Sequence, residues 1–80
     1  MPLYVSVMTL TPQQCRAARG WLDWSQDDLA KAANLSLSTV RDFEKGRRVP
    51  ISNNLNAMAT ALATAGITLT ENGIAYQTAA

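Results

Sequence analysis

The chain has 80 residues, which allows one small domain and leaves too little buried surface for a deep, enclosed active site. Its content of 48% hydrophobic and 16% charged residues is typical of a globular protein rather than a disordered one. One cysteine and no histidine exclude an internal disulfide, the ordinary zinc ligand sets and histidine-based catalytic triads. We therefore expect no metal, no cofactor and no enzymatic activity.

The formal net charge of +1 does not by itself indicate a nucleic-acid partner, but the basic residues are concentrated. Between positions 41 and 48 the chain carries four basic residues and two acidic ones. Its N-terminus lacks the charged start and long apolar core of a signal peptide, and no apolar run approaches the roughly 20 residues of a membrane span. We expect a cytoplasmic protein that does not contact a membrane.

Residues 1–9 precede the first predicted helix. Leu3, Val5 and Val7 recur at every second position, a spacing that fits a short N-terminal strand. A loose tail, or an upstream start ahead of Met8, fits the same residues equally well. Both interpretations stay open at this point.

The first helix is predicted over residues 12–22. Thr11 followed by Pro12 is typical of an N-cap and a first helical residue, and Gln14 completes a Thr-x-x-Gln capping box. The face expected to point inward consists of Cys15, Ala18, Arg19 and Leu22. We expect Trp21 in the core and Trp24 as an apolar staple, rather than either ring as a platform for base stacking.

Two short helices are predicted next, over residues 26–33 and 37–45. Ser25 and Ser36 are placed to cap them, and Asp28 completes a second capping box. Asn34 stands where a residue in the left-handed conformation ends a helix, and Gly46 is a good stop for the second one. Two capped helices joined by so short a turn indicate a helix-turn-helix pair.

The last third of the chain predicts one more helix and a hairpin. A helix that follows a cap at Ser52 or Asn53 ends at Gly66, and residues 67–80 form a hairpin. Asn72 and Gly73 predict a two-residue turn between the two strands. The strand register that follows from this turn places Leu69 opposite Tyr76. Because a lone hairpin is marginal in water, we expect it to pack on the preceding helix, the N-terminal segment or a second subunit.

The segment from Ser25 to Pro50 resembles the Xre family of helix-turn-helix regulators, which includes Cro and the phage repressors. The residues that carry the resemblance are Ser25, Gln26, Leu29, Ala30, Ala33, Asn34, Leu35, Ser36, Thr39, Val40, Glu44, Gly46 and Pro50, and it extends back to Arg19. Asn34 departs from the glycine usual at its position. The resemblance implies a mainly α fold, a repressor-like domain of four to five helices. We expect a single domain over residues 1–80, with a helical DNA-binding core over 11–66 and the hairpin as a possible dimerisation element.

The resemblance also assigns roles to three polar residues. In the family, the equivalents of Arg19 and Glu44 form a salt bridge between the first and third helices, and we expect it to serve orientation more than stability. Gln26 resembles the residue that bonds a phosphate and braces the recognition helix. The alternative for Gln26 is a good first helical residue without a ligand.

A helical wheel of residues 37–45 defines the proposed reading surface. Val40, Phe43 and Glu44 point inward, whereas Ser38, Arg41, Asp42 and Lys45 share the outer face, with Leu37 at its edge. In a major groove, Ser38 suits a base edge, Leu37 a thymine methyl and Arg41 a guanine. Asp42 suits cytosine N4, with a solvated helix charge as the alternative. Phosphate contacts are expected from Gln26, Ser36, Thr39, Lys45, Arg47, Arg48 and Asn53.

These observations predict a sequence-specific transcriptional regulator, a dimeric repressor that binds a palindromic operator in double-stranded DNA. The alternative is an antitoxin or anti-activator that has this fold but works mainly by binding a partner protein through its hairpin. An enzyme is the weakest hypothesis, because no segment gathers a nucleophile, a base and an orienting group.

Overall fold

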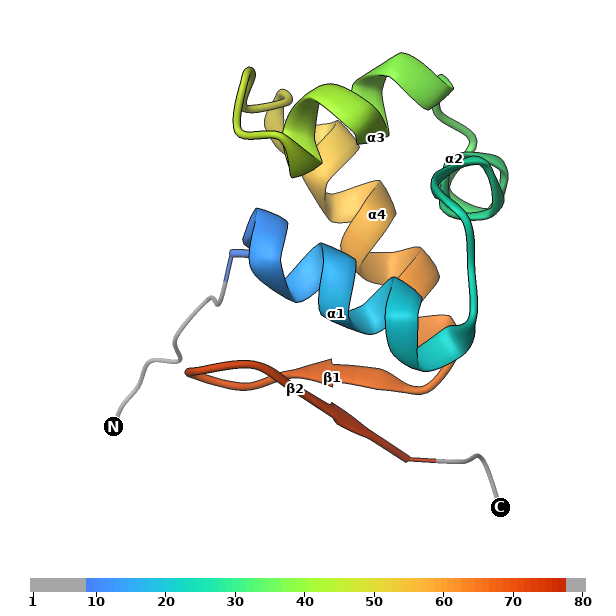
Figure 1. The fold of residues 1–80 in the computed structure, drawn as a ribbon, viewed down its shortest axis with the longest axis vertical. Coiled ribbons are helices and arrows are strands. Elements are labelled where there is room, and N and C mark those ends of the chain that lie inside the picture. Colours follow the sequence, from blue (N-terminus) through green and yellow to red (C-terminus); the bar gives the residue numbers. More distant parts are fainter. Residues whose placement is uncertain (1–8, 78–80) are drawn as a thin grey trace.

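The computed structural model describes residues 9–77, and this part of the chain holds four helices followed by one hairpin (Figure 1). The elements are α1 (Pro12–Leu22), α2 (Gln26–Ala33), α3 (Leu37–Glu44), α4 (Ser52–Thr64), β1 (Ile67–Leu69) and β2 (Ile74–Tyr76). The predicted mainly α fold with a C-terminal hairpin is confirmed. The strand considered for the N-terminal segment lies outside the described residues. Each helix among residues 9–77 is too short or too polar to cross a bilayer.

Local side-chain caps start the first three helices, as predicted. The hydroxyl of Thr11 accepts a hydrogen bond from the backbone N–H of Gln14, and the side-chain oxygen of Gln14 accepts one from the backbone N–H of Thr11. Ser25 and Asp28 form the same reciprocal capping box. Ser36 caps α3 by accepting from the Thr39 N–H. Each such cap supplies a partner to an N–H group that has none within its helix, which is worth about 1 kcal/mol.

Three predicted helix boundaries are wrong. The N-cap of α4 is Ile51, which makes no side-chain cap, because Ser52 and Asn53 already lie inside the helix. Ile51 is extended, with φ −62° and ψ 159°, and the first helical residue is Ser52, one of the two residues expected to cap the helix. Helix α3 ends at Glu44 rather than Lys45, which takes the C-cap position. Helix α4 ends at Thr64 rather than Gly66, with Ala65 as its C-cap.

The hydrophobic core lies between the helices and the hairpin. Leu29, Val40, Met58 and Leu62 are fully buried, one from α2, one from α3 and two from α4. In Figure 1, α3 and the hairpin lie at opposite ends of the molecule, with α1 and α4 between them. The core therefore holds α3 against the other helices on one side and leaves its other side free.

Trp21 was expected in the core, and that expectation is wrong. Its side chain is 61% exposed, since it lies on α1 away from the buried stripe that contains Cys15 and Ala18. The Trp21 ring instead packs against Tyr76 of β2, with 5.7 Å between ring centroids and a tilt of 46°. Trp24 is half-buried against the core. The two tryptophans thus have different environments.

The hairpin register also differs from the prediction. Ile67 pairs with Tyr76 and Leu69 with Ile74, so the connection has four residues, 70–73, rather than two. A type I′ turn requires positive φ at both central residues, and neither Asn72 nor Gly73 has it. The side-chain amide of Gln14 instead donates to the carbonyls of Thr70 and Gly73, at 2.8 and 3.0 Å, and holds the wider loop.

Gly66 joins α4 to β1 in a conformation that suits only glycine. Its φ is +105°, and a Cβ there would lie 2.8 Å from the carbonyl oxygen of Gln77 and 2.9 Å from the Tyr76 ring. The Gln77 N–H donates to the Gly66 carbonyl at 2.9 Å, so the hairpin closes directly on this residue. A larger residue would push β2 away from α4.

Substitution of Asn34 tests the turn between α2 and α3. Asn34 has φ 59° and ψ 46°, a left-handed conformation that asparagine tolerates and alanine does not. We expect Asn34→Ala to lower the free energy of unfolding by about 1 kcal/mol, and Asn34→Gly to match or exceed wild type. Urea denaturation measures both. Equal losses in the two variants would contradict a backbone origin of the effect.

Candidate nucleic-acid interface

The α2–turn–α3 unit is held by backbone hydrogen bonds at the turn. The N–H of Leu35 donates to the Ala30 carbonyl at 2.8 Å, and the N–H of Asn34 donates to the Lys31 carbonyl at 3.2 Å. This is the pairing expected where a left-handed residue ends a helix. Because α3 begins at Leu37, only Asn34, Leu35 and the Ser36 cap separate the two helices. The direction of α3 therefore follows closely from that of α2.

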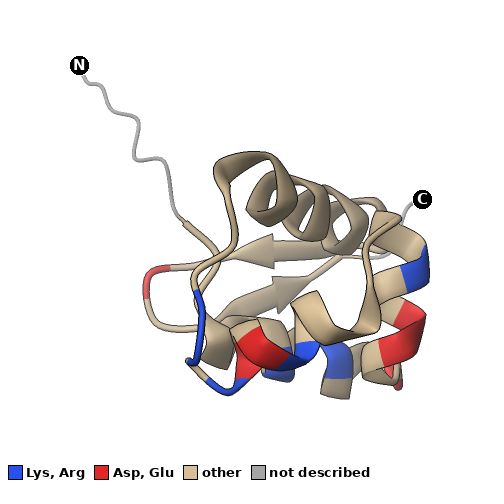
Figure 2. Cartoon of the chain, turned by 90° about the horizontal axis from the view of Figure 1, so that it is seen from above, with Lys and Arg blue, Asp and Glu red and all other residues tan. Residues whose placement is uncertain are grey.

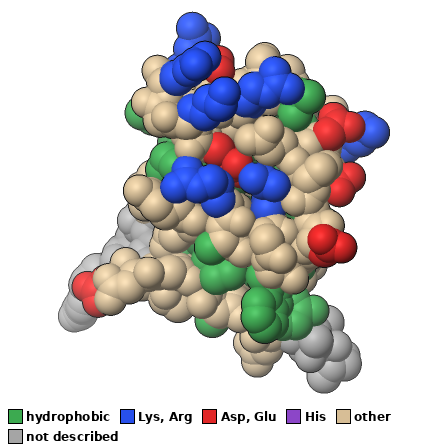
Figure 3. All heavy atoms as spheres, viewed as in Figure 1, with side chains coloured by type: hydrophobic (Ala, Val, Ile, Leu, Met, Phe, Trp, Pro, Cys, Tyr) green, Lys and Arg blue, Asp and Glu red, His purple; other side chains and the backbone are tan. Residues whose placement is uncertain are grey.

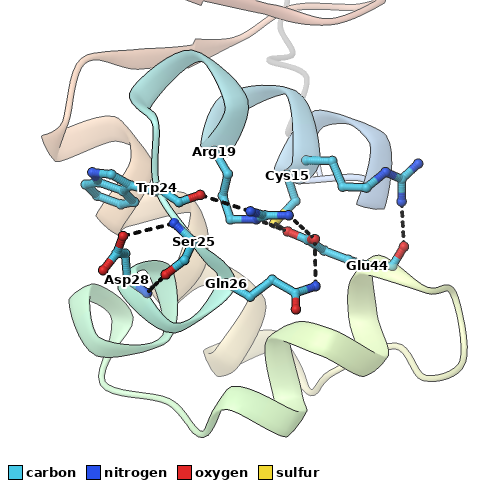
Figure 4. Close-up of polar contacts among 8 residues, drawn as sticks. Cys15, Arg19, Trp24, Ser25, Gln26, Asp28 and Glu44 are labelled. Atoms are coloured by element: carbon cyan, nitrogen blue, oxygen red, sulfur yellow. Dashed lines mark hydrogen bonds and ion pairs between the residues drawn. The ribbon is translucent and has the colours of Figure 1, made fainter.

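The carboxylate of Glu44, the last residue of α3, joins three helices (Figure 4). Arg19 of α1 binds both of its oxygens through Nε and Nη2, each at 2.6 Å. Gln26 of α2 donates from Nε2 to Oε1 at 3.1 Å, and the thiol of Cys15 donates to Oε2 at 3.0 Å. Glu44 is only 4% exposed, so these donors replace the water it has lost. We call this set, Cys15, Arg19, Gln26 and Glu44, the Glu44 cluster.

Charge and burial act against each other in the Glu44 cluster. Burial by itself raises the pKa of Glu44, but hydrogen bonds from Arg19, Cys15 and Gln26 outweigh it and leave the pKa below its ordinary value. The hydrogen bond to Glu44 raises the pKa of Arg19. Burial and then the contact with Glu44 raise the pKa of the Cys15 thiol. The cluster therefore holds a charged carboxylate, a charged guanidinium and a neutral thiol at neutral pH.

The outer side of α3 is exposed and polar. Ser38 and Arg41 are exposed, Leu37 and Asp42 are half-buried, and Val40 and Phe43 on the opposite side are buried. The structure thus divides α3 along the same line as the helical wheel. Of the predicted base-reading residues, Ser38 and Arg41 are the exposed ones, whereas the half-buried Asp42 lines a groove together with the segment that follows α3.

The basic residues after α3 extend this surface. Lys45, Arg47 and Arg48 are exposed on the segment that follows α3. Figure 3 shows the Lys and Arg side chains gathered on the half of this face that carries α3, and Figure 2 shows the uncharged helix α4 on the other side of the molecule. A net charge of +1 for the whole chain therefore conceals a strongly basic face.

The remaining predicted phosphate-binding residues have different surroundings. Gln26 donates from its amide nitrogen to Glu44, so it braces α3 directly, and within residues 9–77 its second amide N–H has no acceptor. The Ser36 hydroxyl lies 2.7 Å from that of Thr39, at the start of α3. Asn53 is exposed in the first turn of α4, next to Asn54, which lines a groove together with Ser38 and Thr39 at the start of α3.

A groove beside α3 contains residues that the sequence did not suggest. Ser38, Thr39, Asp42 and Arg48 line it together with Val49, Pro50, Ile51 and Asn54. Val49 and Ile51 are 80% and 69% exposed, so two aliphatic side chains face solvent beside the basic segment. Their only sequence signal is their place next to the basic run, since no periodicity marks a loop residue.

Replacing the carboxylate of Glu44 tests how much the Glu44 cluster contributes. In Glu44→Gln the half-buried guanidinium of Arg19 loses its counter-ion, and we expect the free energy of unfolding at pH 7 to fall by about 3 kcal/mol. Urea denaturation measures the loss. Glu71→Gln, which removes an exposed carboxylate from the hairpin loop, is the control and should have little effect.

The difference in unfolding free energy between wild type and Glu44→Gln should depend on pH. Because the folded-state pKa of Glu44 lies below that of an unfolded glutamate, about 4.3, its stabilisation is complete above that pH. The stabilisation is lost as the pH falls through the folded-state pKa. The difference between wild type and Glu44→Gln should therefore shrink in acid, and a difference that stays constant down to pH 2 would contradict a charged Glu44.

Comparison with known proteins agrees with this geometry. A helix-turn-helix family model matches residues 16–67 of the chain, from within α1 through α2, α3 and α4 to the start of β1. No individual curated protein matches the chain. The matched segment covers more than half of the 80 residues and contains the whole α2–turn–α3 unit. The chain therefore belongs to the Cro/repressor type of the helix-turn-helix family, the family of DNA-binding transcription regulators that includes the Xre and phage repressors.

Proposed function

We propose that this protein is a sequence-specific repressor that binds a palindromic operator as a dimer, with α3 in the major groove of each half-site. The observation that carries the proposal is the division of α3 into an inner side held by the Glu44 cluster and a free, polar outer side. An α-helix fits the major groove, and its first residues reach the base edges. Occupying a promoter in this way is the simplest mechanism of repression.

The proposed contacts fall into two groups. Leu37, Ser38, Arg41 and Asp42 read bases, Arg41 by its forked donors on guanine and Asp42 by accepting from cytosine. The second group binds phosphates without regard to sequence and comprises Gln26, Ser36, Thr39, Lys45, Arg47, Arg48 and Asn53. In residues 9–77 neither Arg41 nor Lys45 has an ion-pair partner, which supports their availability for DNA.

Footprinting on the DNA upstream of the protein's own gene, at two salt concentrations, tests this function. We expect a protected palindrome at low salt and weaker protection at high salt, because phosphate contacts release counter-ions. Arg41→Ala should lose one bidentate base contact and bind about 5- to 150-fold more weakly, with relaxed preference at one base pair.

Lys31→Ala is the matched control, because it removes an equal charge from a residue that pairs with Asp27 on α2. Absence of a protected palindrome at low salt would refute the repressor function. Wild-type affinity and base preference in Arg41→Ala would refute the role of Arg41 alone.

The hairpin supports the proposed dimer. Among residues 9–77, β2 pairs only with β1, along one edge, and we propose that its other edge pairs with a second copy across a two-fold axis. Beside it, Trp21 and Tyr76 form an aromatic pair whose members are 61% and 41% exposed. Aromatic side chains of this kind are enriched where proteins associate.

Sedimentation velocity over a range of concentrations tests the dimer. We expect Trp21→Ser to weaken association at least tenfold, the effect of losing about 1.4 kcal/mol from an interface. Val49→Ser, which removes an even more exposed apolar side chain next to α3, should leave association unchanged. A dimer that forms equally well in Trp21→Ser would place the interface elsewhere.

The same aromatic pair favours a second candidate function, binding of a partner protein through the hairpin, as in an antitoxin or anti-activator. A wild-type protein that stays monomeric and protects no DNA at low salt would favour this function over repression. The exposed aromatic surface would then be the contact with the partner.

A further inference from the structure

Arg16 of α1 lies against the end of the proposed recognition helix. Its Nη1 donates to the backbone carbonyl oxygen of Glu44, the last residue of α3, so the guanidinium is next to Lys45 in space. The side chain is exposed, in contrast to Arg19 one turn later, which is committed to the Glu44 carboxylate. Arg16 thus reaches from α1 to the point where the basic segment after α3 begins.

The charge of Arg16 is not neutralised by a carboxylate. In residues 9–77 the ion pairs are Arg19 with Glu44 and Lys31 with Asp27. A backbone carbonyl carries only a partial charge, so Arg16 retains a full positive charge after making its hydrogen bond. A guanidinium has five N–H donors in a fixed fork, and the Glu44 carbonyl uses one of its nitrogens. The remaining N–H donors of Arg16 can bind an anion that approaches from solvent, and the hydrogen bond to the Glu44 carbonyl already restricts their orientation.

The basic face extends to α1. In Figure 3 the Lys and Arg side chains lie over α3, over the segment after it and over α1, as comparison with Figure 1 shows. The basic residues of α1 are Arg16 and Arg19, and of these Arg16 is the exposed one. A DNA duplex seated on the outer side of α3 would present its phosphates to such a continuous face.

We propose that Arg16 binds a phosphate of the DNA backbone beside the bases that α3 reads, which adds α1 to the DNA interface. This inference rests on the proposed function. The hydrogen bond to the Glu44 carbonyl restricts the guanidinium before DNA arrives, so less side-chain freedom is lost on binding. The Arg16 guanidinium would then connect the end of α3 to the DNA backbone and fix the position of α3 along the major groove.

The test compares Arg16→Gln with Lys31→Gln on a random-sequence duplex of about 20 base pairs. Both variants lose one positive charge, but Lys31 is paired with Asp27 and belongs to α2. Loss of one phosphate contact should reduce the slope of log K against log salt by about 0.9 and weaken binding about eightfold near 0.1 M salt. Lys31→Gln should keep the wild-type slope, and Arg16→Lys, which retains the charge, should keep most of it.

Urea denaturation separates this role from a purely structural one. A change in unfolding free energy for Arg16→Gln together with an unchanged salt slope would overturn the phosphate contact and leave Arg16 as a helix-end partner of α3. In that case salt-dependent binding by the wild type would leave the proposed function intact. A wild-type protein that does not bind the duplex at low salt would overturn both proposals.

Discussion

A single buried carboxylate governs how the helices of this protein are arranged. Glu44 accepts four hydrogen bonds from three residues, two of them on α1 and one on α2. Burying a carboxylate is costly unless its oxygens are satisfied, so any movement of α3 that breaks these bonds is strongly opposed. Apolar contacts of Val40 and Phe43 also hold α3, but they lack direction and would tolerate rotation or sliding. The Glu44 cluster therefore sets the angle at which the outer side of α3 faces solvent.

The sequence was most informative where the deciding contact is local. The caps at Thr11, Ser25 and Ser36 depend on bonds that span three residues, and these helix starts follow directly from the residue types. The division of α3 into two sides follows from helical periodicity alone. The family resemblance supplied the pairing of Arg19 with Glu44, which local rules do not predict because the two residues are 25 positions apart.

Features decided by distant contacts were predicted poorly. The amide of Gln14 holds the hairpin loop from 56 residues away, and nothing near Asn72 reveals that bond. Trp21 packs against Tyr76, 55 positions later in the chain, and α4 begins after Ile51 without any side-chain cap that the sequence could reveal. The contact of Arg16 with the Glu44 carbonyl could not be predicted for the same reason, because nothing in the sequence near Arg16 indicates a partner on the third helix.

The three residues that donate to Glu44 all lie outside α3, and this has a consequence for how such a regulator changes over time. Ser38 and Arg41 contribute nothing to the Glu44 cluster, and substitutions at exposed positions of this kind usually alter stability by less than 0.5 kcal/mol. Selection can therefore replace the outer residues of α3 one at a time while the domain stays folded. Duplicated copies of such a gene can diverge toward new operators without passing through unfolded intermediates, and the same freedom is open to a protein engineer.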